Sequence, residues 1–404
     1  MRAGNGDVAM LGRTPSTAGD DCVARARALG SLIASHAAET ERGRALAPAV
    51  LDALHGAQLF RMLLPRSCGG LEVEPAIFMQ AIEEIAKADG STAWCVVQGS
   101  GCSFAAAYLE PKVAREIYAD PRAVIASGPG PSGKAVVTAG GYRVTGRWSF
   151  ASGIKHATWL ACHCPVIAAD GTPRLVPDGK PAERTLLFPK ARAELTDIWR
   201  VVGLKGTGSD VYAVDDLFVP DACSYTREAP SERRESGPLY RCFSNYQLYG
   251  TGFAAVALGL ARASLDAFIA LATTKTPYSK TGLLRYNAVI QSQVALAEAK
   301  LSSARSYLVG LLRDTWDAAL AGEQPTLDRR ARIKLAGVYA AHQGKEVIDT
   351  VYHAAGASAI FEDNPFERRL RDVHTVLQQV QAQYTNFELV GQVLLGLPSQ
   401  TKLI

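Results

Sequence analysis

The sequence has few of the features that place a protein in a membrane, on nucleic acid or outside the cell. Within its 404 residues no apolar run reaches the roughly 18 residues that cross a bilayer, and the most apolar stretch, near Gly250–Leu260, is broken by glycines. The net charge is only +4 and no long Lys/Arg run exists, which argues against a nucleic-acid partner or an anionic membrane surface. The first twenty residues lack the apolar core of a signal peptide, so we expect a loose tail at 1–20 and a cytoplasmic protein.

Metal-binding and dinucleotide-binding motifs are also missing. Eight cysteines are scattered along the chain, and without an export signal we expect them to stay reduced. The densest set is Cys162-His163-Cys164, but adjacent residues of a strand point to opposite faces, and no second ligand pair follows at zinc spacing. This set therefore predicts a buried strand and no metal. No Gly-x-Gly-x-x-Gly joins a strand to a helix, which argues against a Rossmann domain.

What the sequence does contain is a hydrophobic pattern whose period changes twice along the chain. Hydrophobic residues make up 48% and charged residues 20%, an ordinary balance for a globular protein. Residues 21–121 follow a helical period and predict an N-terminal helical domain. Residues 122–238 follow a period of two and predict a central antiparallel β domain. Residues 239–404 return to the helical period, and their long segments with short loops predict a C-terminal four-helix bundle.

The individual elements follow from the same pattern. The expected helices are Asp21–His36, Pro48–Leu59, Pro75–Ala88, Ser91–Leu109, Tyr246–Thr273, Asn287–Ala321, Leu327–Ala355 and Asp372–Leu395. The expected strands are Ala123–Ser127, Ala135–Ala139, Tyr142–Thr145, Ala157–His163, Thr185–Pro189 and Val211–Val219. Because helices and strands are segregated along the chain, we expect an α+β fold and not a doubly wound parallel sheet.

Five local strings follow one another along nearly the whole chain: Leu64–Gly70, Gly90–Trp94, Gly141–Gly153, Gly203–Asp210 and Arg371–Thr375. In this order they resemble the acyl-CoA dehydrogenase superfamily. Within the superfamily they resemble the branch that contains the oxygenase components of two-component flavin-dependent monooxygenases. Members of that branch include the 4-hydroxyphenylacetate hydroxylase, secosteroid phenol hydroxylase and dibenzothiophene monooxygenase types.

This resemblance implies a function, a cofactor and partners. The implied enzyme takes reduced FMN or FAD from a separate NAD(P)H-flavin reductase. It then uses O2 to hydroxylate, or to S- or N-oxygenate, a small aromatic substrate through a C4a-hydroperoxyflavin. The resemblance also implies a homotetramer built by the bundle helices. Two other functions stay open: a flavin-dependent acyl-CoA dehydrogenase or oxidase with a relocated base, and a non-catalytic protein with the flavin fold.

The catalytic carboxylate of the dehydrogenases separates these alternatives. A dehydrogenase needs this base to remove the α-proton while hydride leaves to the flavin. In most members of the superfamily it follows an Arg-Asp pair, and counting from Arg371-Asp372 puts that place near Val380. No acid lies between Asp372 and Glu388, and the stretch 246–258, which matches the place used by other members, contains none either. The missing base favours the monooxygenase.

Two residues are the candidates for catalysis. His374 directly follows the Arg-Asp-x string, where the resembling monooxygenases have a His near the flavin, and an imidazole that titrates near neutrality can relay protons. The alternative is a His at a helix N-terminus that only binds a backbone group. Ser152 lies in the string that resembles the flavin-facing turn, where the resembling oxygenases bind flavin N5 with a hydroxyl. Its alternative is a turn Ser before Gly.

Further residues are candidates for holding the flavin. Ser149 and the backbone of Ala151 are alternative donors to flavin N5, and Trp148 is expected to pack against the isoalloxazine unless it belongs to the β core. Arg285 and Gln291 match places where the superfamily often grips the flavin phosphates or adenosine, frequently across a subunit boundary, and Arg suits bidentate phosphate contact. Arg371 could do the same, or pair with a carboxylate. The expected cofactor-binding set is Trp148, Ser149, Ser152, Arg285, Gln291 and Arg371.

The candidates for substrate binding are less specific. Ser127 lies in a Gly/Pro-rich run, residues 125–131, that allows the backbone to approach a ring closely. The resembling phenol hydroxylases use a Ser here, but its partner His on the preceding helix is absent, and this chain has Gln98 to Ser103 there. The small residues Ser100 and Cys102 predict either room for a bulky ligand or tight helix packing. The expected substrate-binding set is Ser127, Ser100, Cys102 and His374.

Overall fold

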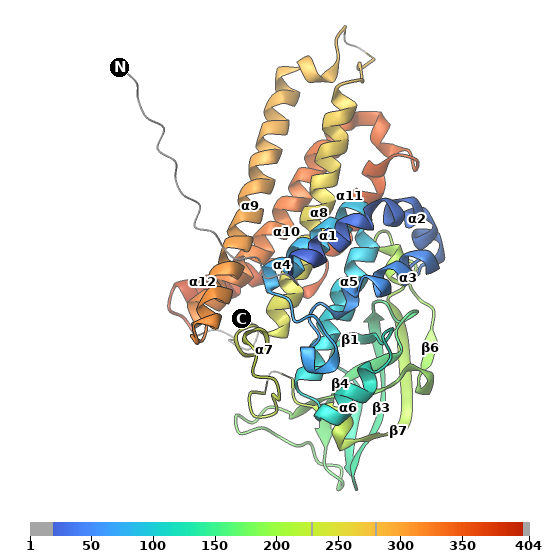
Figure 1. The fold of residues 1–404 in the computed structure, drawn as a ribbon, viewed down its shortest axis with the longest axis vertical. Coiled ribbons are helices and arrows are strands. Elements are labelled where there is room, and N and C mark those ends of the chain that lie inside the picture. Colours follow the sequence, from blue (N-terminus) through green and yellow to red (C-terminus); the bar gives the residue numbers. More distant parts are fainter. Residues whose placement is uncertain (1–18, 228, 279–280, 399–404) are drawn as a thin grey trace.

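The computed structural model describes residues 19–227, 229–278 and 281–398. The expected loose tail at 1–20 lies outside the described residues up to residue 18, and a helix begins at Gly19. Six helices precede the sheet and lie beside it and beside the long C-terminal helices (Figure 1). They are α1 (Gly19–Ala28), α2 (Gly30–Gly43), α3 (Pro48–Gly56), α4 (Pro75–Ala88), α5 (Gly90–Ser103) and α6 (Pro111–Tyr118).

Eight strands lie in the described part of the chain, and together they form one sheet with the order β6-β7-β3-β2-β4-β5-β8, in which β1 pairs with β4. Most pairs are antiparallel as expected, but β1 and β2 both run parallel to β4, which corrects the fully antiparallel expectation. The reason is that residues 152–158 carry the chain from β3 to the far edge of β2. The strands are β1 (Ile125–Pro131), β2 (Lys134–Thr138), β3 (Gly141–Ala151), β4 (Trp159–Ile167), β5 (Glu183–Pro189), β6 (Glu194–Thr196), β7 (Asp210–Pro220) and β8 (Ser224–Tyr225).

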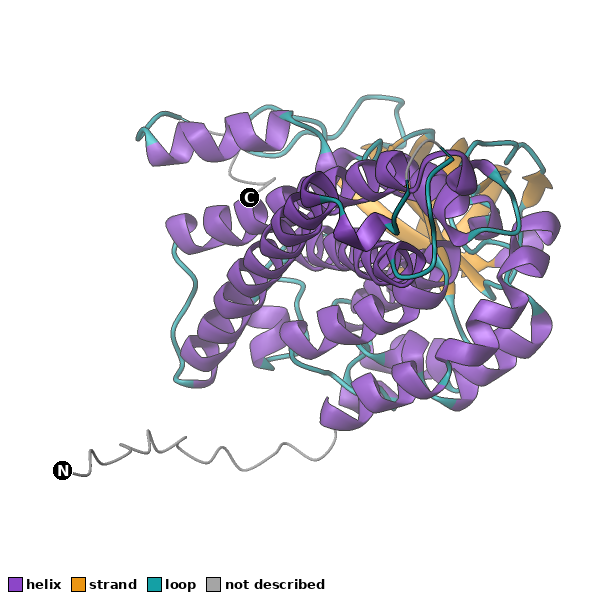
Figure 2. Ribbon diagram, turned by 90° about the horizontal axis from the view of Figure 1, so that it is seen from above, coloured by secondary structure: helices purple, strands orange, loops and turns teal. Residues whose placement is uncertain are grey.

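The C-terminal region consists of helices, so the expected α+β class, with helices on both sides of a β region in the sequence, is confirmed. Three of these helices are long, lie side by side and extend away from the sheet (Figure 1). Seen from above, the strands are gathered at one side of the molecule and the helices cover them (Figure 2). The helices are α7 (Pro238–Cys242), α8 (Asn245–Ala272), α9 (Ala288–Leu320), α10 (Leu327–Ala355), α11 (Pro365–Val376) and α12 (Thr385–Leu394).

Helix α8 is the central helix of this core. It begins at a capping box, in which the Ser244 side chain accepts from the backbone of Gln247 and the Gln247 side chain accepts from the backbone of Ser244. Among the described residues, α8 is the one helix long and apolar enough to cross a membrane by length and composition. Its apolar side chains are instead buried against α4 and α10. Close contact requires a small residue, since a Cβ at Gly259 would lie 2.4 Å from the backbone oxygen of Glu83.

The last expected helix, Asp372–Leu395, is wrong as a single element. Helix α11 ends at Val376, a short 3-10 turn follows at residues 380–382, and α12 begins only at Thr385. The intervening segment is rich in Gln and has no apolar repeat, and its side chains bind backbone groups in place of a helix. The Gln379 side chain accepts from the backbone N–H of Gln381 at 2.7 Å, and the Asn386 amide donates to the Val380 carbonyl at 2.7 Å.

The second half of α11 joins all three regions. The buried Asp372 carboxylate accepts a 2.6 Å hydrogen bond from the backbone N–H of Leu204 in the β region. The neighbouring Arg371 binds Glu367 with two hydrogen bonds and also donates to Glu41 of α2 at 2.7 Å. Burial, with the nearby charge of Asp89, raises the pKa of Asp372 to about 7. This carboxyl is therefore a titrating group at the centre of the structure.

A first prediction concerns the pH dependence of stability. The pKa of Asp372 is higher in the folded protein, about 7, than the roughly 3.9 of an unfolded Asp. Between these values the folded state binds more protons, so the contribution of Asp372 to stability falls as pH rises from about 4 to 7. The Asp372→Asn variant does not titrate at this position. We expect its unfolding free energy, relative to the unaltered protein, to increase by on the order of 1–4 kcal/mol over that interval.

The measurement is urea unfolding of both proteins at a series of pH values. Asp52→Asn, at a surface carboxylate paired with Arg122, is the control for the loss of a carboxyl group, and the change with pH should be larger for Asp372→Asn. A constant difference for Asp372→Asn would contradict the buried titration.

Candidate functional site

A cavity of about 750 Å³ lies where the β region, α5, α8 and the segment after α11 meet. Among the described residues that line it, Glu183 is the one acid and Arg227 the one cation, while most of the others are aromatic, hydroxyl or amide side chains. The lining residues are Trp94, Gln98, Ser127, Gly128, Pro129, Gly130, Phe150, Ser152, His163, Glu183, Trp199, Leu204, Thr207, Ser209, Arg227, Asn245, Tyr246, Tyr249, Phe253, Thr375, Gln378, Gln379, Val380, Gln381 and Gln383.

A chain of hydroxyl groups forms one wall of this cavity. The indole N–H of Trp94 donates to Ser152 Oγ at 3.0 Å, and Ser152 Oγ lies 2.7 Å from Ser209 Oγ. Ser209 Oγ is in turn 2.7 Å from Thr207 Oγ1, which donates to the Leu204 carbonyl at 2.8 Å. Since the Thr207 proton goes to a carbonyl, Ser209 donates to Thr207 and Ser152 donates to Ser209. Ser152 therefore keeps an oxygen lone pair, and no proton, for a ligand in the cavity.

Aromatic rings form the neighbouring surfaces. Trp94 is stacked on Phe253 of α8, with ring centroids 4.0 Å apart. Phe150 has a left-handed backbone, with φ at 60°, and its exposed ring meets Trp199 edge-on at 6.1 Å. A non-glycine residue in this conformation costs free energy, and such strain clusters at functional sites. Flat apolar surfaces beside a fixed polar wall suit a planar ligand with polar atoms at its edge.

Strand β1 and its neighbour β4 supply a second polar group. Ser127 Oγ lies 3.3 Å from His163 Nε2, and His163 Nδ1 lies 2.8 Å from Thr185 Oγ1. Sequence reasoning missed His163, because it treated residues 162–164 only as a buried strand. The alternation that sends Cys162 and Cys164 together into the β core, with their sulfurs 3.8 Å apart, is what turns His163 to the cavity.

The segment between α11 and α12 closes another side of the cavity. Its break from helical geometry brings four glutamines and Val380 to the lining, and His342 of α10 fixes it through a 2.9 Å contact with the Ala382 carbonyl. The position expected to carry the dehydrogenase carboxylate, Val380, thus does face the cavity and presents an isopropyl group. An apolar side chain there cannot remove a proton.

The structure brings only some of the expected site residues to the cavity. Ser152 and Ser127 line it. Trp148 does not, because its ring is buried in the β core, stacked on Tyr212 at 5.3 Å, with its N–H donating to the His163 carbonyl at 3.2 Å. The expected packing of Trp148 against a flavin ring is therefore replaced by the alternative, a core residue. Ser149 is exposed on β3 and is also absent from the lining.

The expected substrate residues on α5 are packed into the protein. Ser100 is fully buried and donates to the Leu59 carbonyl at 3.2 Å, so its hydroxyl serves helix packing. Cys102 Sγ lies 3.3 Å from the hydroxyl of Tyr249, which does line the cavity. Burial raises the pKa of the Cys102 thiol to about 11, so it is not a thiolate. Of the two, only Cys102 is placed to influence a ligand, through Tyr249.

His374 and the expected flavin-phosphate residues lie away from the cavity. His374 is half-exposed, and its Nε2 contacts Asp349 of α10 at 2.9 Å. The adjacent Thr375 takes the place in the lining, because consecutive residues of a helix point about 100° apart. Arg285 and Gln291 are exposed at the start of α9, where the Gln291 amide donates to the Arg285 carbonyl at 3.0 Å. Arg371 is held by Glu367 and Glu41 and does not face the cavity either.

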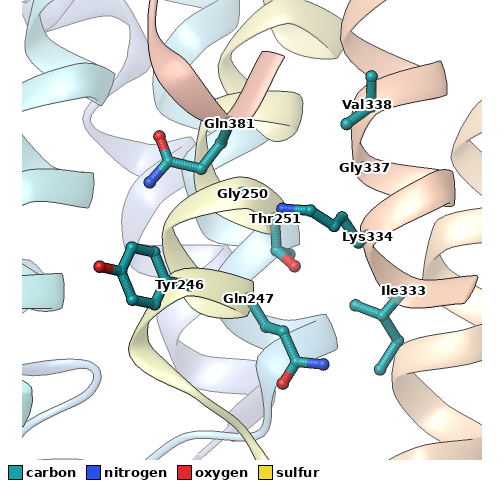
Figure 3. Close-up of a pocket in the computed structure, with 9 residues that line it drawn as sticks. All are labelled: Tyr246, Gln247, Gly250, Thr251, Ile333, Lys334, Gly337, Val338 and Gln381. Atoms are coloured by element: carbon teal, nitrogen blue, oxygen red, sulfur yellow. The ribbon is translucent and has the colours of Figure 1, made fainter. Parts of the chain in front are cut away.

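A second, much smaller cavity lies between α8 and α10 and shares Tyr246 and Gln381 with the large one (Figure 3). Lys334 reaches across it toward Thr251, and burial lowers the pKa of the Lys334 amine to about 8. Within the described residues, the Thr251 hydroxyl and the Gln247 amide nitrogen are buried without a hydrogen-bond partner. The small cavity thus collects polar groups that are not satisfied by the protein alone.

Comparisons with known proteins agree with this arrangement. Residues 251–384 match the family model described as "Acyl-CoA dehydrogenase, C-terminal domain". The chain is 29% identical over 359 residues to the indole-3-acetate monooxygenase of Pseudomonas putida, covering 89% of each protein. It is 29% identical over 350 residues to HsaA, a flavin-dependent monooxygenase oxygenase subunit of Mycobacterium tuberculosis, covering 85% of this chain and 86% of that one.

Two solved structures share the fold over almost their whole length. The HsaA monooxygenase from M. tuberculosis has a TM-score of 0.87 at 27% identity, over 96% of this chain and 100% of that one. XiaF from Streptomyces sp., solved with FADH2 and glycerol, has a TM-score of 0.88 at 25% identity, over 95% and 97%. The chain has the acyl-CoA dehydrogenase fold of these proteins. It is a flavin-dependent monooxygenase.

The residues of the monooxygenase cavity fit a flavin. The isoalloxazine ring is flat and carries N–H and C=O groups at its edge, which matches aromatic surfaces beside the Ser152 hydroxyl chain. Gly128 keeps β1 pressed against β3, since a Cβ there would lie 2.5 Å from the Ser149 carbonyl oxygen. The site therefore offers a rigid, partly apolar wall in which one hydroxyl is fixed.

A second prediction concerns Lys334. Its folded pKa, about 8, is below the roughly 10.4 of an unfolded Lys, so the folded state disfavours the ammonium form. This cost is fully present below pH 8 and disappears as pH rises through 10. Replacing the amine by a thioether of similar length removes the cost. We expect Lys334→Met to raise the midpoint of thermal unfolding at pH 7 by about 2–4 °C.

The gain should shrink as pH approaches 10, and scanning calorimetry across that range measures it. Lys112→Met, at an exposed lysine of α6, is the matched control and should change the midpoint little. A stabilisation by Lys334→Met that is equal at pH 7 and pH 10 would contradict the explanation from buried charge.

Proposed function

We propose that this monooxygenase hydroxylates, or S- or N-oxygenates, a small aromatic molecule with O2 and with reduced FMN or FAD supplied by a separate NAD(P)H-flavin reductase. The observation that carries the proposal is that Ser152 is a hydrogen-bond acceptor, oriented in the cavity by Trp94 and Ser209. The same cavity has Val380 where a dehydrogenase would have its catalytic base. The names of the similar proteins, a monooxygenase of indole-3-acetate and an oxygenase subunit, support the same reaction class. We expect it to act in the cytoplasm, where such a reductase finds NAD(P)H.

We assign to Ser152 the discrimination between reduced and oxidised flavin. Bound reduced flavin supplies the two electrons that activate O2. Reduced flavin has an N–H at N5, whereas oxidised flavin has an acceptor nitrogen there. Because the proton of Ser152 is committed to Ser209, its oxygen accepts from such an N–H and meets the oxidised ring with two opposed lone pairs. The hydroxyl chain thereby favours the reduced form that a diffusing cofactor must have on arrival.

The other lining residues bind the flavin and the substrate and enclose them. The rings of Trp94, Phe253 and Trp199 provide apolar surface for a flavin and an aromatic substrate, and they exclude water from the reacting atoms. The glutamines after α11 offer neutral donors and acceptors without adding charge. No step in this scheme needs a carboxylate base, which agrees with the residue found at position 380.

The catalytic role of His374 remains a proposal that its position does not favour. Its imidazole lies outside the cavity lining and contacts Asp349, so a proton from the cavity would have to pass through Thr375 or the segment that follows. We therefore assign the positioning of protons in the cavity to the hydroxyl chains, and retain His374 as a test residue.

We further propose that the protein is a homotetramer and that its helices α9 contact neighbouring subunits. Val289, Leu296 and Tyr307 share one face of α9 at spacings of seven and eleven residues, and this face is exposed in the single chain. Gln291 lies in the first turn of the same helix, and Arg285 lies in the 3-10 turn just before it. An interface on α9 would give them a route to the flavin phosphates or adenosine of another subunit, which the cavity of their own subunit does not offer.

The first test of this function is the affinity for flavin in each redox state. We expect the protein to bind reduced FMN or FAD about tenfold more tightly than the oxidised form, measured by equilibrium ultrafiltration with and without oxygen. Ser209→Ala releases the Ser152 proton, so this ratio should fall toward one, while Ser149→Ala should preserve it. If the protein instead bound oxidised FAD tightly and an acyl-CoA reduced that FAD directly, the protein would be a dehydrogenase.

The second test is the yield of oxygenated product per reduced flavin consumed, with a panel of phenols, indoles, thiophenes and amines. Loss of the Ser152 oxygen removes the acceptor for N5–H, so we expect Ser152→Ala to release H2O2 about tenfold faster and to lower the yield. His374→Ala is the comparison, and we expect it to keep the yield. A yield unaffected in Ser152→Ala but lost in His374→Ala would restore the catalytic assignment of His374 and remove that of Ser152.

A further inference from the structure

The pair formed by His163 of β4 and Ser127 of β1 is a second built polar site in the cavity, distinct from the Ser152 chain. Both residues line the cavity, and their side chains meet at 3.3 Å. Ser127 is half-buried, and His163 is buried with its Nδ1 2.8 Å from the Thr185 hydroxyl. Three side chains from three strands thus converge on one edge of the space left for a ligand.

The position of each proton in this trio follows from the contacts. Among the described residues, Thr185 Oγ1 has no hydrogen-bond partner other than His163 Nδ1, and a buried hydroxyl that leaves its proton unbonded is costly. Thr185 therefore donates to Nδ1. Burial, with the charge of Arg227 nearby, lowers the pKa of His163 to about 3, so the ring is neutral and carries its single proton on Nε2.

The consequence reaches Ser127. Nε2–H donates to Ser127 Oγ, and the Ser127 hydroxyl donates to the Gly128 carbonyl at 3.2 Å. With its proton committed to Gly128 and one lone pair taken by His163, Ser127 has one lone pair left. A ligand that approaches Ser127 from the cavity therefore meets a hydrogen-bond acceptor whose orientation is fixed from behind.

We propose that His163 and Ser127 form an acceptor site that selects aromatic substrates bearing an O–H or N–H group, such as phenols and indoles, over aromatic sulfides and thiophenes. The inference rests on the proposed function and narrows its substrate class. Ser127 touches the substrate, and His163 is a positioning residue that acts through Ser127. A substrate without a donor leaves the Ser127 lone pair facing an apolar atom, and a buried unpaired polar group reduces affinity more than an added contact raises it.

If His163 only packed in the β core, its hydrogen-bond partners would differ. A histidine that only filled the strand would find the partner for its Nε2 inside the β core, and the cysteines on either side, at 162 and 164, already supply the buried face of β4. The imidazole is instead bonded at both nitrogens, and its Nε2 partner is a residue of the cavity wall. The ring thus couples the rigid interior of the sheet to the orientation of one hydroxyl.

The test uses two pairs of probes that differ in one group: indole with benzothiophene, and phenol with toluene. Equilibrium binding to the full-length protein is measured by calorimetry under nitrogen, with and without reduced FMN, so that no oxygenation is needed. After correction for water–octanol partition, we expect the unaltered protein to bind the donor of each pair about tenfold more tightly than its isostere. Ser127→Ala and His163→Phe should bring this ratio close to one.

His163→Gln is the conservative variant, since its amide can accept from Thr185 and donate to Ser127, and it should recover most of the ratio. His156→Phe is the matched control, because burial also lowers the pKa of His156 to about 3 and this histidine of the β region does not line the cavity. Should His163→Phe not fold, Thr185→Val removes the donor to Nδ1 with little change in shape, and the ratio should fall there.

Three results would overturn the proposal. One is an unaltered protein that binds both members of each pair equally, or binds neither. Another is a ratio that survives in Ser127→Ala while the thermal midpoint and flavin affinity are normal. The third is an equal fall in His156→Phe. Because these are binding measurements, a protein that keeps the ratio but never oxygenates the probes would refute the proposed function and support this site.

Discussion

The buried contact between Asp372 and the backbone N–H of Leu204 is the constraint on which the rest of the site depends. It fixes the second half of α11 against the β region. Only glycine fits at the residue before Leu204, since a Cβ at Gly203 would lie 2.1 Å from the Arg371 carbonyl oxygen. The Asp372 contact also holds Leu204 in a left-handed conformation, with φ at 50°. The carbonyl of Leu204 then accepts from Thr207, which is the end of the hydroxyl chain that commits the proton of Ser152. One desolvated carboxyl at a domain junction thus holds the residue whose carbonyl ends the hydroxyl chain of Ser152.

This dependence explains why the fold was easier to predict than the site. Long periodic segments define their own ends, so α10 was predicted at its observed bounds and α8 and α9 to within one residue at each end. Ser152 and Ser127 were found because local strings mark them. His163 carries no local mark, because its partners Ser127 and Thr185 are brought to it by sheet pairing between strands distant in sequence. The break after Val376 was missed for a related reason, since side-chain contacts with the backbone and with α10 replace the helical bonds there.

The same fold serves dehydrogenation and oxygenation because the chemistry lies in a few side chains that project into one cavity. Dehydrogenation needs a charged base beside the substrate, and the cavity places a valine at the corresponding position. Among the described residues that line it, the one acid is Glu183, which lies on β5 and not on the segment after α11. Oxygenation needs a pocket that excludes water and in which each proton is held by a fixed hydrogen bond. The mostly uncharged lining, the stacked rings of Trp94 and Phe253 and the hydrogen-bonded hydroxyls meet that need.

Both fixed hydroxyls of the cavity come out as acceptors, and this has a common physical origin. Each serine belongs to a set of hydrogen bonds that includes a carbonyl, which can only accept: the Leu204 carbonyl at the end of the Ser152 chain, and the Gly128 carbonyl, which takes the proton of Ser127 beside the neutral ring of His163. Reversing either relay would strand a proton or a lone pair inside the protein, at the cost of a buried unsatisfied group. The polarity of the cavity is therefore a property of the folded β region and not of the two serines. The His163 relay is also insensitive to pH across the neutral range, because the pKa of His163, about 3, is far below it. A cavity with two fixed acceptors distinguishes its ligands by whether they carry an O–H or N–H donor. Reduced flavin shares such a donor with phenols and indoles.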